Sequence, residues 1–465
     1  MKHLIRNLGL TFFSSLLCSM AYAQDLYTIL ELALENDPTL KQAEAQYRAN
    51  RENLSQSRSA LLPSFGAGGS TSRVTSGPAD DVFRTFPDPL TGAPTSVLVQ
   101  PRHSYGNGLN NHGWGVNLSQ SVLNLASWYT FQSAKASDRA AAVNLAAQEQ
   151  DLIMRVAMAY FDVLRAQELL ATNLQEEEAA LRSLEQTRQR EEVGLVALTD
   201  VFDSQAAYDL ARNTTILQRD LLRARFEALE AITGQPHGDI DELRADFPIL
   251  EVDGSLIDWE DQAEDNSLAI AAARYNLEAS RKNLRARKAD RLPTVDFLGQ
   301  YGHNVTAPII SQGIQIGGGA FDRTSLALSI NIPIYTGGAV SSRRRQAEQN
   351  LVAAQESLEL TRRQLTQNIR NAYRRVNTDV LVIAQRQQSI DSAQLALDAT
   401  ELGAEVGTRN IVEVLRAREN LFRALRQYAD ARFNYVLDTL LLKQVAGILT
   451  PDDIIALNEW LQSEG

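Results

Sequence analysis

Long stretches without glycine or proline most constrain how this chain can fold. Four stretches are free of both residue types: residues 126–193, 195–233, 339–402 and 408–446. Gly194 separates the first two, and Gly407 stands just before the last. Because Gly and Pro are the strongest breakers of a helical pattern, each pair predicts a very long helix, a tight turn and a shorter return helix. The chain therefore predicts two helical hairpins, at about 126–233 and about 339–446.

The two hairpins belong to two copies of one unit. Ala159-Tyr160 recurs as Ala372-Tyr373, and both tyrosines precede their turn glycine by the same distance. The spacing from Tyr160 to Tyr373 is the hairpin offset. A second match holds at a slightly larger spacing, which we call the leading offset. It relates Arg51, Asn53, Leu54, Leu62 and Pro63 of the first copy to Arg281, Asn283, Leu284, Leu292 and Pro293 of the second. The difference between the two offsets indicates an insertion in the first copy.

The period of this match is far longer than the roughly 20–50 residues of a solenoid repeat. It therefore predicts an internally duplicated domain. The first repeat is expected over residues 24–247 and the second over residues 248–465.

The beginning of the chain has the composition of a secretory signal peptide. Lys2 and Arg6 precede an apolar run over residues 8–20. The following Ala-Tyr-Ala places small residues at both positions that determine cleavage. These features predict a signal peptide over residues 1–23 and therefore export of the protein.

The site of cleavage has one alternative. Cys18 would suit a lipoprotein, but Leu17 is a poor residue to precede a lipidated cysteine, so cleavage before Gln24 is favoured. The remaining chain would then contain no cysteine. Loss of Lys2 and Arg6 would also make the formal net charge two units more negative than −12, which argues against a nucleic-acid partner.

Four segments alternate between apolar side chains and small or polar ones, at about 64–74, 113–124, 294–305 and 324–335. Outside the signal peptide, no apolar run has the roughly 18 residues that a membrane-spanning helix needs. Alternation over about ten residues is typical of a barrel strand between lipid and water. A half-buried sheet in a soluble protein would alternate in the same way. We prefer lipid, because the neighbouring helical segments are too polar to bury these strands.

Four strands are too few to close a barrel, since the smallest outer-membrane barrels use about eight. Three chains would supply twelve strands, so we predict a homotrimer, although the spacing alone also allows two or four chains. Residues 75–112 and 306–322 suit the longer outer loops of such a barrel. The predicted fold class is an α+β membrane protein, with a long α-helical coiled-coil barrel and four strands per chain in a twelve-stranded transmembrane β-barrel.

Apolar side chains step by four and three along both long segments, which is the pattern of a coiled-coil seam. They lie at Leu152, Val156, Ala159, Val163, Ala166 and Leu170, and again at Leu365, Ile369, Ala372 and Val376. A continuous helix over residues 126–193 would be roughly 100 Å long, which does not fit inside a globular core. Residues 235–262 are acidic and contain Pro and Gly, which predicts an outer linker, joined by the C-terminal segment 450–460.

The turns carry the most specific motifs. Residues 193–201 are VGLVALTDV and residues 406–415 are VGTRNIVEVL, supported by Leu62-Pro63 and Leu292-Pro293 before the first strand of each copy. In these motifs the chain resembles the TolC family of outer-membrane efflux ducts, over nearly all of the sequence after the signal peptide. The resemblance implies a trimeric duct in the outer membrane of a Gram-negative bacterium. It continues as a twelve-helix tunnel across the periplasm, and the hairpin turns form its closed end.

The resemblance also implies a gate at that end. Asp200 matches an aspartate that helps to latch the tunnel shut, Arg409 matches its arginine partner, and Glu413 matches an acidic ring position that would attract cations. The alternative is an exposed ion pair, worth ~0 to 1 kcal/mol, with no gating role. The chain departs from the family pattern twice. Ala404 replaces a tyrosine of the latch, and Arg416 replaces a second aspartate of the ring and could neutralise Glu413.

The same turns are the expected docking points for a periplasmic adaptor, because glycine leaves backbone accessible there. The residues concerned are Gly194, Leu195, Val196, Gly407 and Thr408. Through the adaptor, the duct would draw energy from an inner-membrane pump of the RND, ABC or MFS type. The expected role is the exit duct of a tripartite efflux pump or a type I secretion system, with outer-membrane lipid as a further contact.

No sequence motif indicates catalysis or a cofactor. A phosphate-binding Gly-Lys-Ser/Thr does not occur, and the histidines form no pair at helical spacing that would suit zinc. We therefore predict passive conduction by a protein that is not an enzyme. The alternative from a different class is a soluble, secreted coiled-coil scaffold. It would account for the helices and the signal peptide, but not for the alternating strands.

Overall fold

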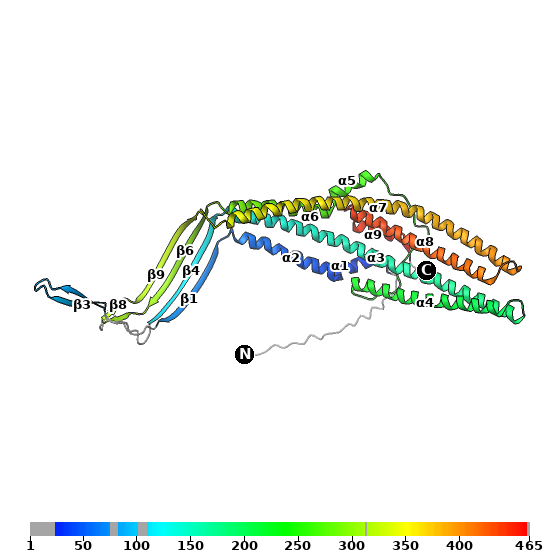
Figure 1. Ribbon diagram of the computed structural model, residues 1–465, viewed down its shortest axis with the longest axis horizontal. Helices are drawn as coiled ribbons and strands as arrows, with labels where there is room; N and C mark the ends of the chain where they lie inside the picture. Colours follow the sequence, from blue (N-terminus) through cyan, green and yellow to red (C-terminus); the bar gives the residue numbers. More distant parts are fainter. Residues whose placement is uncertain (1–23, 75–81, 101–108, 312–313, 463–465) are drawn as a thin grey trace, which may run out of the picture. The chain divides into compact units, whose positions relative to one another are not determined.

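The computed structural model describes residues 24–74, 82–100, 109–311 and 314–462 (Figure 1). The predicted signal peptide lies outside the described residues. The chain divides into two compact units. The first unit contains the residues up to 47, residues 142–271 and the residues from 359 onward, and the second contains residues 48–141 and 272–358.

The first unit is largely helical. It contains much of α3 (Leu125–Glu192) and α7 (Ala339–Glu405), together with α1 (Leu26–Asn36), α4 (Leu198–Thr233), β5 (Glu242–Leu243), α5 (Leu256–Asn266), α8 (Ile411–Val445), α9 (Pro451–Asn458) and β10 (Leu461–Gln462). Helices α3 and α4 form one hairpin, and α7 and α8 form the other (Figure 1). The core includes the fully buried side chains of Leu26, Ile29, Leu152, Tyr160, Phe161, Leu229 and Leu442.

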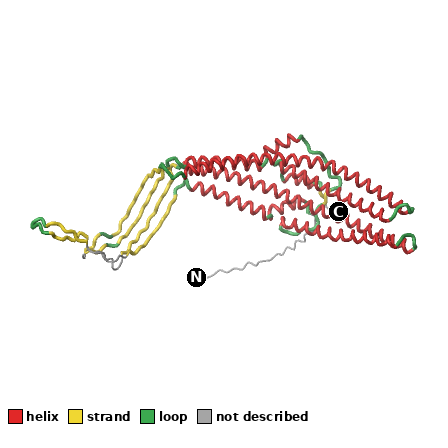
Figure 2. Tube along the Cα trace, in the orientation of Figure 1, coloured by secondary structure: helices red, strands yellow, loops and turns green. Residues whose placement is uncertain are grey.

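The second unit is built around a four-stranded antiparallel sheet in the order β1-β4-β6-β9, whose strands are yellow in Figure 2. These strands are β1 (Ser64–Val74), β4 (Leu109–Leu123), β6 (Thr294–Thr306) and β9 (Gly319–Asn331). The shorter hairpins pair β2 (Val82–Pro87) with β3 (Pro94–Gln100), and β7 (Ile309–Ser311) with β8 (Ile314–Ile316). Most of α2 (Pro38–Ser59) and α6 (Leu268–Ala289) also belongs to this unit.

The mixture of long helices and four strands is the α+β composition that the sequence predicts. The predicted strand at 324–335 needs a correction, since β9 begins at Gly319 and ends at Asn331. Pro333 has no N–H for a sheet ladder and disfavours regular pairing around itself, so the alternating residues after 331 do not extend the strand. Among the described residues, no helix combines the length and the apolarity needed to cross a bilayer.

The duplication is visible in the lengths of the elements. Helices α1 and α5 each have 11 residues, and α2 and α6 each have 22. The first residues of both pairs are related by the leading offset, which also relates Arg51 to Arg281. The hairpin helices correspond as well, with 68 and 67 residues in α3 and α7, and 36 and 35 in α4 and α8. Each copy therefore consists of two short helices, two long strands and a hairpin.

The glycines that end the two return helices differ in their surroundings, although both have a positive φ, 77° at Gly234 and 75° at Gly447. A Cβ at Gly447 would lie 2.5 Å from the carbonyl oxygen of Asn266, whereas a Cβ at Gly234 would come no closer than 3.5 Å to Asn36. Alanine at either position costs about 1–2 kcal/mol for the left-handed backbone. Only at Gly447 does it also clash with backbone.

We therefore expect Gly447→Ala to lower the midpoint of thermal unfolding clearly more than Gly234→Ala does. Circular dichroism of the two purified variants measures this difference. Equal midpoints would mean that the backbone near Asn266 moves away at little cost, and would contradict the prediction.

Candidate functional site

Both long helices end in the same turn. The N–H of Gly194 donates to the carbonyl of Glu191 and that of Leu195 to the carbonyl of Arg190, both at 2.8 Å. Gly407 and Thr408 repeat this pattern at 3.3 and 2.8 Å. This is the Schellman motif, which places a left-handed residue after the helix. The φ of 74° at Gly194 and 80° at Gly407 explains why glycine stands at each turn.

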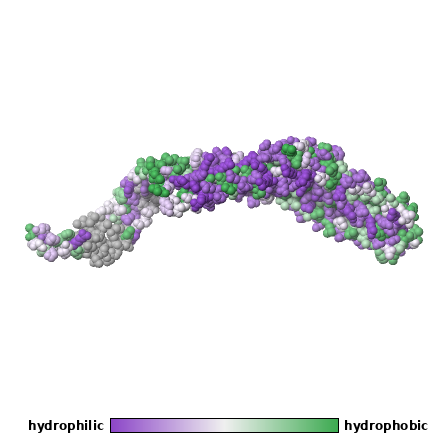
Figure 3. Space-filling model, turned by 45° about the horizontal axis from the view of Figure 1, so that its top comes forward, coloured by the Kyte–Doolittle hydropathy of each residue, from purple (hydrophilic) through white to green (hydrophobic). Residues whose placement is uncertain are grey.

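Apolar side chains are exposed around these turns. The largest exposed fractions are 74% at Leu195, 69% at Val193 and 68% at Val406. Phe202 and Leu402, a few residues further along the helices, are each 63% exposed. Figure 3 shows apolar surface at this end of the hairpins. Such a patch marks an interaction surface more often than a solvated one.

Arg409 and Glu413 form an ion pair at the start of α8, with 2.9 Å between Nη1 and Oε2. Asn410 caps this helix, because its Oδ1 accepts a hydrogen bond from the Glu413 N–H at 2.9 Å. The stem of Arg409 packs against Gly403, where a Cβ would lie 2.7 Å from the Arg409 Cγ. Arg409 is therefore held between the end of α7 and the start of α8.

The structure does not bring Asp200 and Arg409 together. Asp200 lies in the first turn of α4, where a negative charge suits the helix dipole. Among the described residues of this single chain, its side chain makes neither a hydrogen bond nor an ion pair. The same holds for Arg416, so within the chain Arg409 and not Arg416 is the cation paired with Glu413. The four-residue spacing places Arg409 and Glu413 on one helix face.

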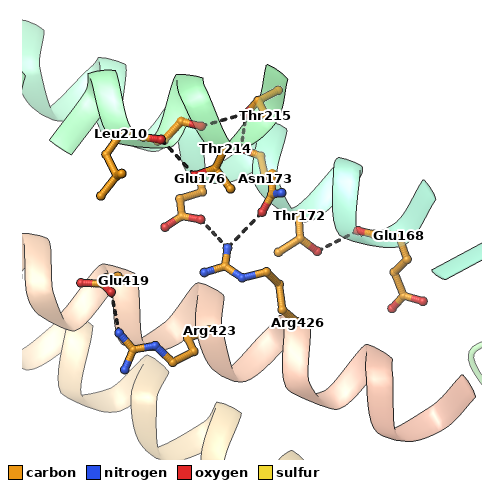
Figure 4. A network of polar contacts seen from close by, with 11 residues as sticks. Glu168, Thr172, Asn173, Glu176, Leu210, Thr214, Thr215, Glu419, Arg423 and Arg426 are labelled. Carbon is orange, nitrogen blue, oxygen red and sulfur yellow. Dashed lines mark hydrogen bonds and ion pairs between the residues drawn. The ribbon is translucent and has the colours of Figure 1, made fainter. Parts of the chain in front are cut away.

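Two arginines of α8 tie the second hairpin to the first, and Figure 4 shows one of them, Arg426. Arg426 donates to Asn173 Oδ1 at 3.0 Å and also to the carboxylate of Glu176, both on α3. Arg418 donates to the carbonyl of Ala179 on α3 at 2.8 Å and to Glu401 of α7 at 2.7 Å. These contacts connect helices that are far apart in the sequence.

A pocket of about 280 Å³ lies beside this network. Its lining comes from α3, α4 and α8 and includes Glu176, Ala211, Val412, Arg416 and Glu419. Arg416 therefore stands where the two hairpins meet. Among the described residues, no cluster of three or more side chains is suited to hold a metal ion.

The comparison with known families decides what these hairpins belong to. The profile of the outer membrane efflux protein family matches residues 29–235 and 259–447. The chain belongs to this family. It is 33% identical to outer membrane protein TolC of Vibrio cholerae, over 96% of each chain. It is also 30% identical to outer membrane protein TolC of Escherichia coli, over 98% of this chain and 88% of the relative.

Solved structures share the fold. The outer-membrane protein VceC of Vibrio cholerae superposes with a TM-score of 0.72 at 18% identity, over 91% of this chain and 96% of VceC. The CmeC outer-membrane channel of Campylobacter jejuni gives 0.74 at 18% identity, over 94% and 90%. The expected membership of the TolC family is thus confirmed. The protein is an outer-membrane exit duct for efflux and secretion, with a helical tunnel in the periplasm, and the alternative of a soluble scaffold is wrong.

The arginines that connect the hairpins were not predicted from the sequence. Comparison of the two copies at the hairpin offset carries a signal for them. Arg426 corresponds to Asn213 in the first copy, and Glu176 corresponds to Ser389 in the second. Each of these two charges therefore occurs in only one copy, so the hairpin fold that both copies share does not require it.

Proposed function

We propose that three copies of this outer-membrane duct pool their sheets into one closed barrel. The observation that carries the proposal is the strand order β1-β4-β6-β9, which leaves β1 and β9 as edges of the four-stranded sheet. Unpaired edges are unfavourable in lipid, because their N–H and C=O groups find no water. Pairing of β9 in one copy with β1 in the next would remove every edge.

The side chains of β9 support contact with lipid. Leu326, Leu328 and Ile330 alternate along the strand, so they share one of its faces. Their exposed fractions are 71%, 63% and 62%. Exposure of three large apolar side chains on one face of a strand costs free energy in water, whereas contact of the same side chains with acyl chains is favourable. A purified protein that stays monomeric in mild detergent would contradict the proposed trimer.

The exposed turns would dock a periplasmic adaptor that links the duct to an inner-membrane pump. The apolar surface around Val193, Leu195 and Val406 suits such a partner. Among the relatives, the proteases secretion protein PrtF of Dickeya chrysanthemi is 27% identical over 98% of this chain. We therefore propose service in both efflux and type I secretion. Sensitivity of a deletion strain to toxic compounds, and an assay of its secreted proteins, test the two roles separately.

Closure of the duct would depend on Asp200. Arg409 already neutralises Glu413 within the chain, whereas Asp200 makes no ion pair among the described residues of the single chain, so Asp200 is available to accept donors from a neighbouring copy. In a trimer, such bonds between copies would hold the turns together around the axis. The duct would conduct passively once they break.

Asp200→Ala is expected to raise single-channel conductance in planar bilayers several-fold, because the bonds between copies are lost. Asp203→Ala provides the matched control, since Asp203 is an exposed carboxylate one turn away on α4. It should leave the conductance at the wild-type value. An unchanged trace for Asp200→Ala, or an equal rise in both variants, would count against the gate.

A further inference from the structure

The residue that follows the predicted signal peptide is anchored by its backbone. The N–H of Gln24 donates to the carbonyl of Asp239 at 3.0 Å, and the N–H of Asp241 donates to the carbonyl of Gln24 at 3.3 Å. These bonds form a parallel bridge opposite Ile240. The buried hydroxyl of Tyr160 donates to the carbonyl of Asp241 at 2.7 Å and lies 3.4 Å from that of Gln24. The start of the exported chain is thus an ordered part of the first unit.

The side chain of Gln24 is held as well. Its Oε1 is hydrogen-bonded to Nδ1 of His237, and Nε2 of the same ring lies 2.6 Å from Oγ1 of Thr233. An amide oxygen only accepts hydrogen bonds, so Nδ1 carries the ring proton. Burial lowers the pKa of His237, which favours the neutral ring, and in that form Nε2 accepts from Thr233. This chain of bonds points the Gln24 amide toward His237.

A carboxylate beside this bridge lacks a donor. Oδ1 of Asp241 is buried and has no hydrogen-bond partner among the described residues. Burial, and secondarily the nearby carboxylate of Asp25, raise the pKa of Asp241. A buried carboxylate oxygen without a donor is costly, and a cationic donor would remove that cost.

Comparison with the second copy shows which contacts of Gln24 belong to the shared fold and which occur in the first copy alone. At the leading offset, Gln24 corresponds to Gly254, whose carbonyl accepts from Tyr373 at 3.2 Å just as that of Gln24 accepts from Tyr160. The tyrosine contact therefore belongs to the shared fold. At the hairpin offset, however, residues 237–241 correspond to residues 450–454, which lie at the start of helix α9. The bridge to Gln24 is a feature of the first copy alone.

We propose that residues 237–241 form the binding site for the N-terminus that cleavage creates at Gln24, with the Asp241 carboxylate as acceptor of the new α-ammonium group. Before cleavage, the Gln24 nitrogen offers one hydrogen, which the Asp239 carbonyl accepts. After cleavage it offers three hydrogens and a positive charge. The site is therefore complete only in the processed chain, and removal of the signal peptide adds an ion pair to the first unit.

The same contacts protect the N-terminus from cyclisation. In that reaction the α-amine of an N-terminal glutamine attacks its own side-chain carbonyl carbon, a lactam C–N bond forms, and the amide nitrogen leaves as ammonia. The amine must be uncharged and must approach the amide. Pairing with Asp241 keeps the amine protonated, and the bond to His237 restrains the amide.

The test uses mature trimer purified from outer membranes. Mass spectrometry of the N-terminal peptide should identify Gln24 as the first residue, with a free amine. The rate of acylation of that amine, followed against pH, should give a pKa at least one unit above the usual ~7.7–8.0. Asp241→Asn should return the amine to the ordinary pKa and raise its acylation rate at pH 7 about tenfold.

Asp239→Asn is the matched control, because Asp239 contributes only its backbone carbonyl and its side chain is exposed. This variant should be acylated at the wild-type rate. His237→Ala should increase the fraction of chains that have lost ammonia by cyclisation. The proposal is overturned by a first residue other than Gln24, by a wild-type N-terminus that is fully cyclised, or by equal acylation rates in the Asp241 and Asp239 variants. None of these readouts depends on conduction, so they stand apart from the proposed gate.

Discussion

Arg426→Ala is expected to destabilise the helical unit by about 2 kcal/mol, because it removes charge-assisted hydrogen bonds between the two hairpins. Arg426 bonds to Asn173 and Glu176 of α3 (Figure 4). The side chain of Glu176 is only 16% exposed, so its carboxylate would be left largely desolvated and without its cation. Chemical unfolding followed by circular dichroism measures the loss.

Arg423→Ala provides the control on the same helix. Arg423 pairs with Glu419 one helical turn earlier, and both side chains are more than half exposed. Pairs of this kind contribute about 0.2–0.5 kcal/mol, so this variant should remain close to wild type. A double-mutant cycle between Arg426 and Glu176 should show a coupling of about 1 kcal/mol or more. Equal losses in the Arg426 and Arg423 variants would refute the assignment.

The same variant bears on the proposed gate. If the hairpins part where the duct opens, loss of the Arg426 contacts should increase the time that a single channel spends open. Arg423→Ala should leave the open time unchanged. If Arg426→Ala lowers stability but leaves the open time unchanged, Arg426 stabilises the fold and takes no part in the gate.

Local signals explain why the hairpins were predictable from the sequence. Helices α3, α4, α7 and α8 end within a few residues of the predicted limits, because a Schellman turn needs a residue with positive φ and Gly194 and Gly407 supply it. Strand β1 coincides with the predicted segment at 64–74. Where a single residue type sets the backbone conformation, as glycine does at these turns, the sequence pattern alone was sufficient to predict the element.

The missed features depend on context. Helix α5 overlaps the segment that was predicted as a linker. It was not predicted as a helix, because the Pro and Gly residues around it indicated irregular structure. Its start carries a capping box between Ser255 and Asp258, which is a recognisable signal. The pairing of Asp200 with Arg409 that the family resemblance implies is not made within the single chain, whereas Arg409 and Glu413 meet within one helix turn. A contact between subunits leaves no periodic trace in one sequence.

A second large effect concerns pH, through the carboxyl groups of Asp379 on α7 and Asp438 on α8. Burial, and then the charge of Asp438, raise the pKa of Asp379 to about 7, against a smaller opposing effect of Arg375. Oδ2 of Asp379 is buried without a hydrogen-bond partner among the described residues. Arg375 lies 3.7 Å from Asp438, so one cation faces two carboxyl groups.

The first copy shows that the hairpin does not require this second carboxyl group. At the hairpin offset, Arg375 and Asp438 correspond to Asp162 and Arg225, which form the same ion pair with exchanged charges at 3.4 Å. Asp379 corresponds to Ala166, which is buried. Asp379 is therefore an additional charge in a position where the other copy is apolar.

The sign of the pH effect follows from the raised pKa. The pKa of Asp379 is higher in the folded chain than its ordinary value of 3.8. The folded chain therefore keeps this proton up to a higher pH than the unfolded chain does. The contribution of this carboxyl group to the free energy of unfolding is therefore fully present below pH 3.8 and is lost as the pH rises to about 7. The full shift would amount to about 4 kcal/mol. Because water reaches the pair, we expect about half of that, or about 2 kcal/mol.

Asp379→Asn should remove most of this dependence, because asparagine does not ionise and can still donate to Asp438. We expect the variant to unfold at a higher temperature than wild type at pH 8, and the difference to shrink toward pH 5. Asp391→Asn, an exposed carboxylate on the same helix, should retain the wild-type profile. Parallel curves for wild type and Asp379→Asn from pH 5 to pH 8 would show that the pair carries no proton near neutrality. The steep part of the pH dependence would then have to arise from other groups.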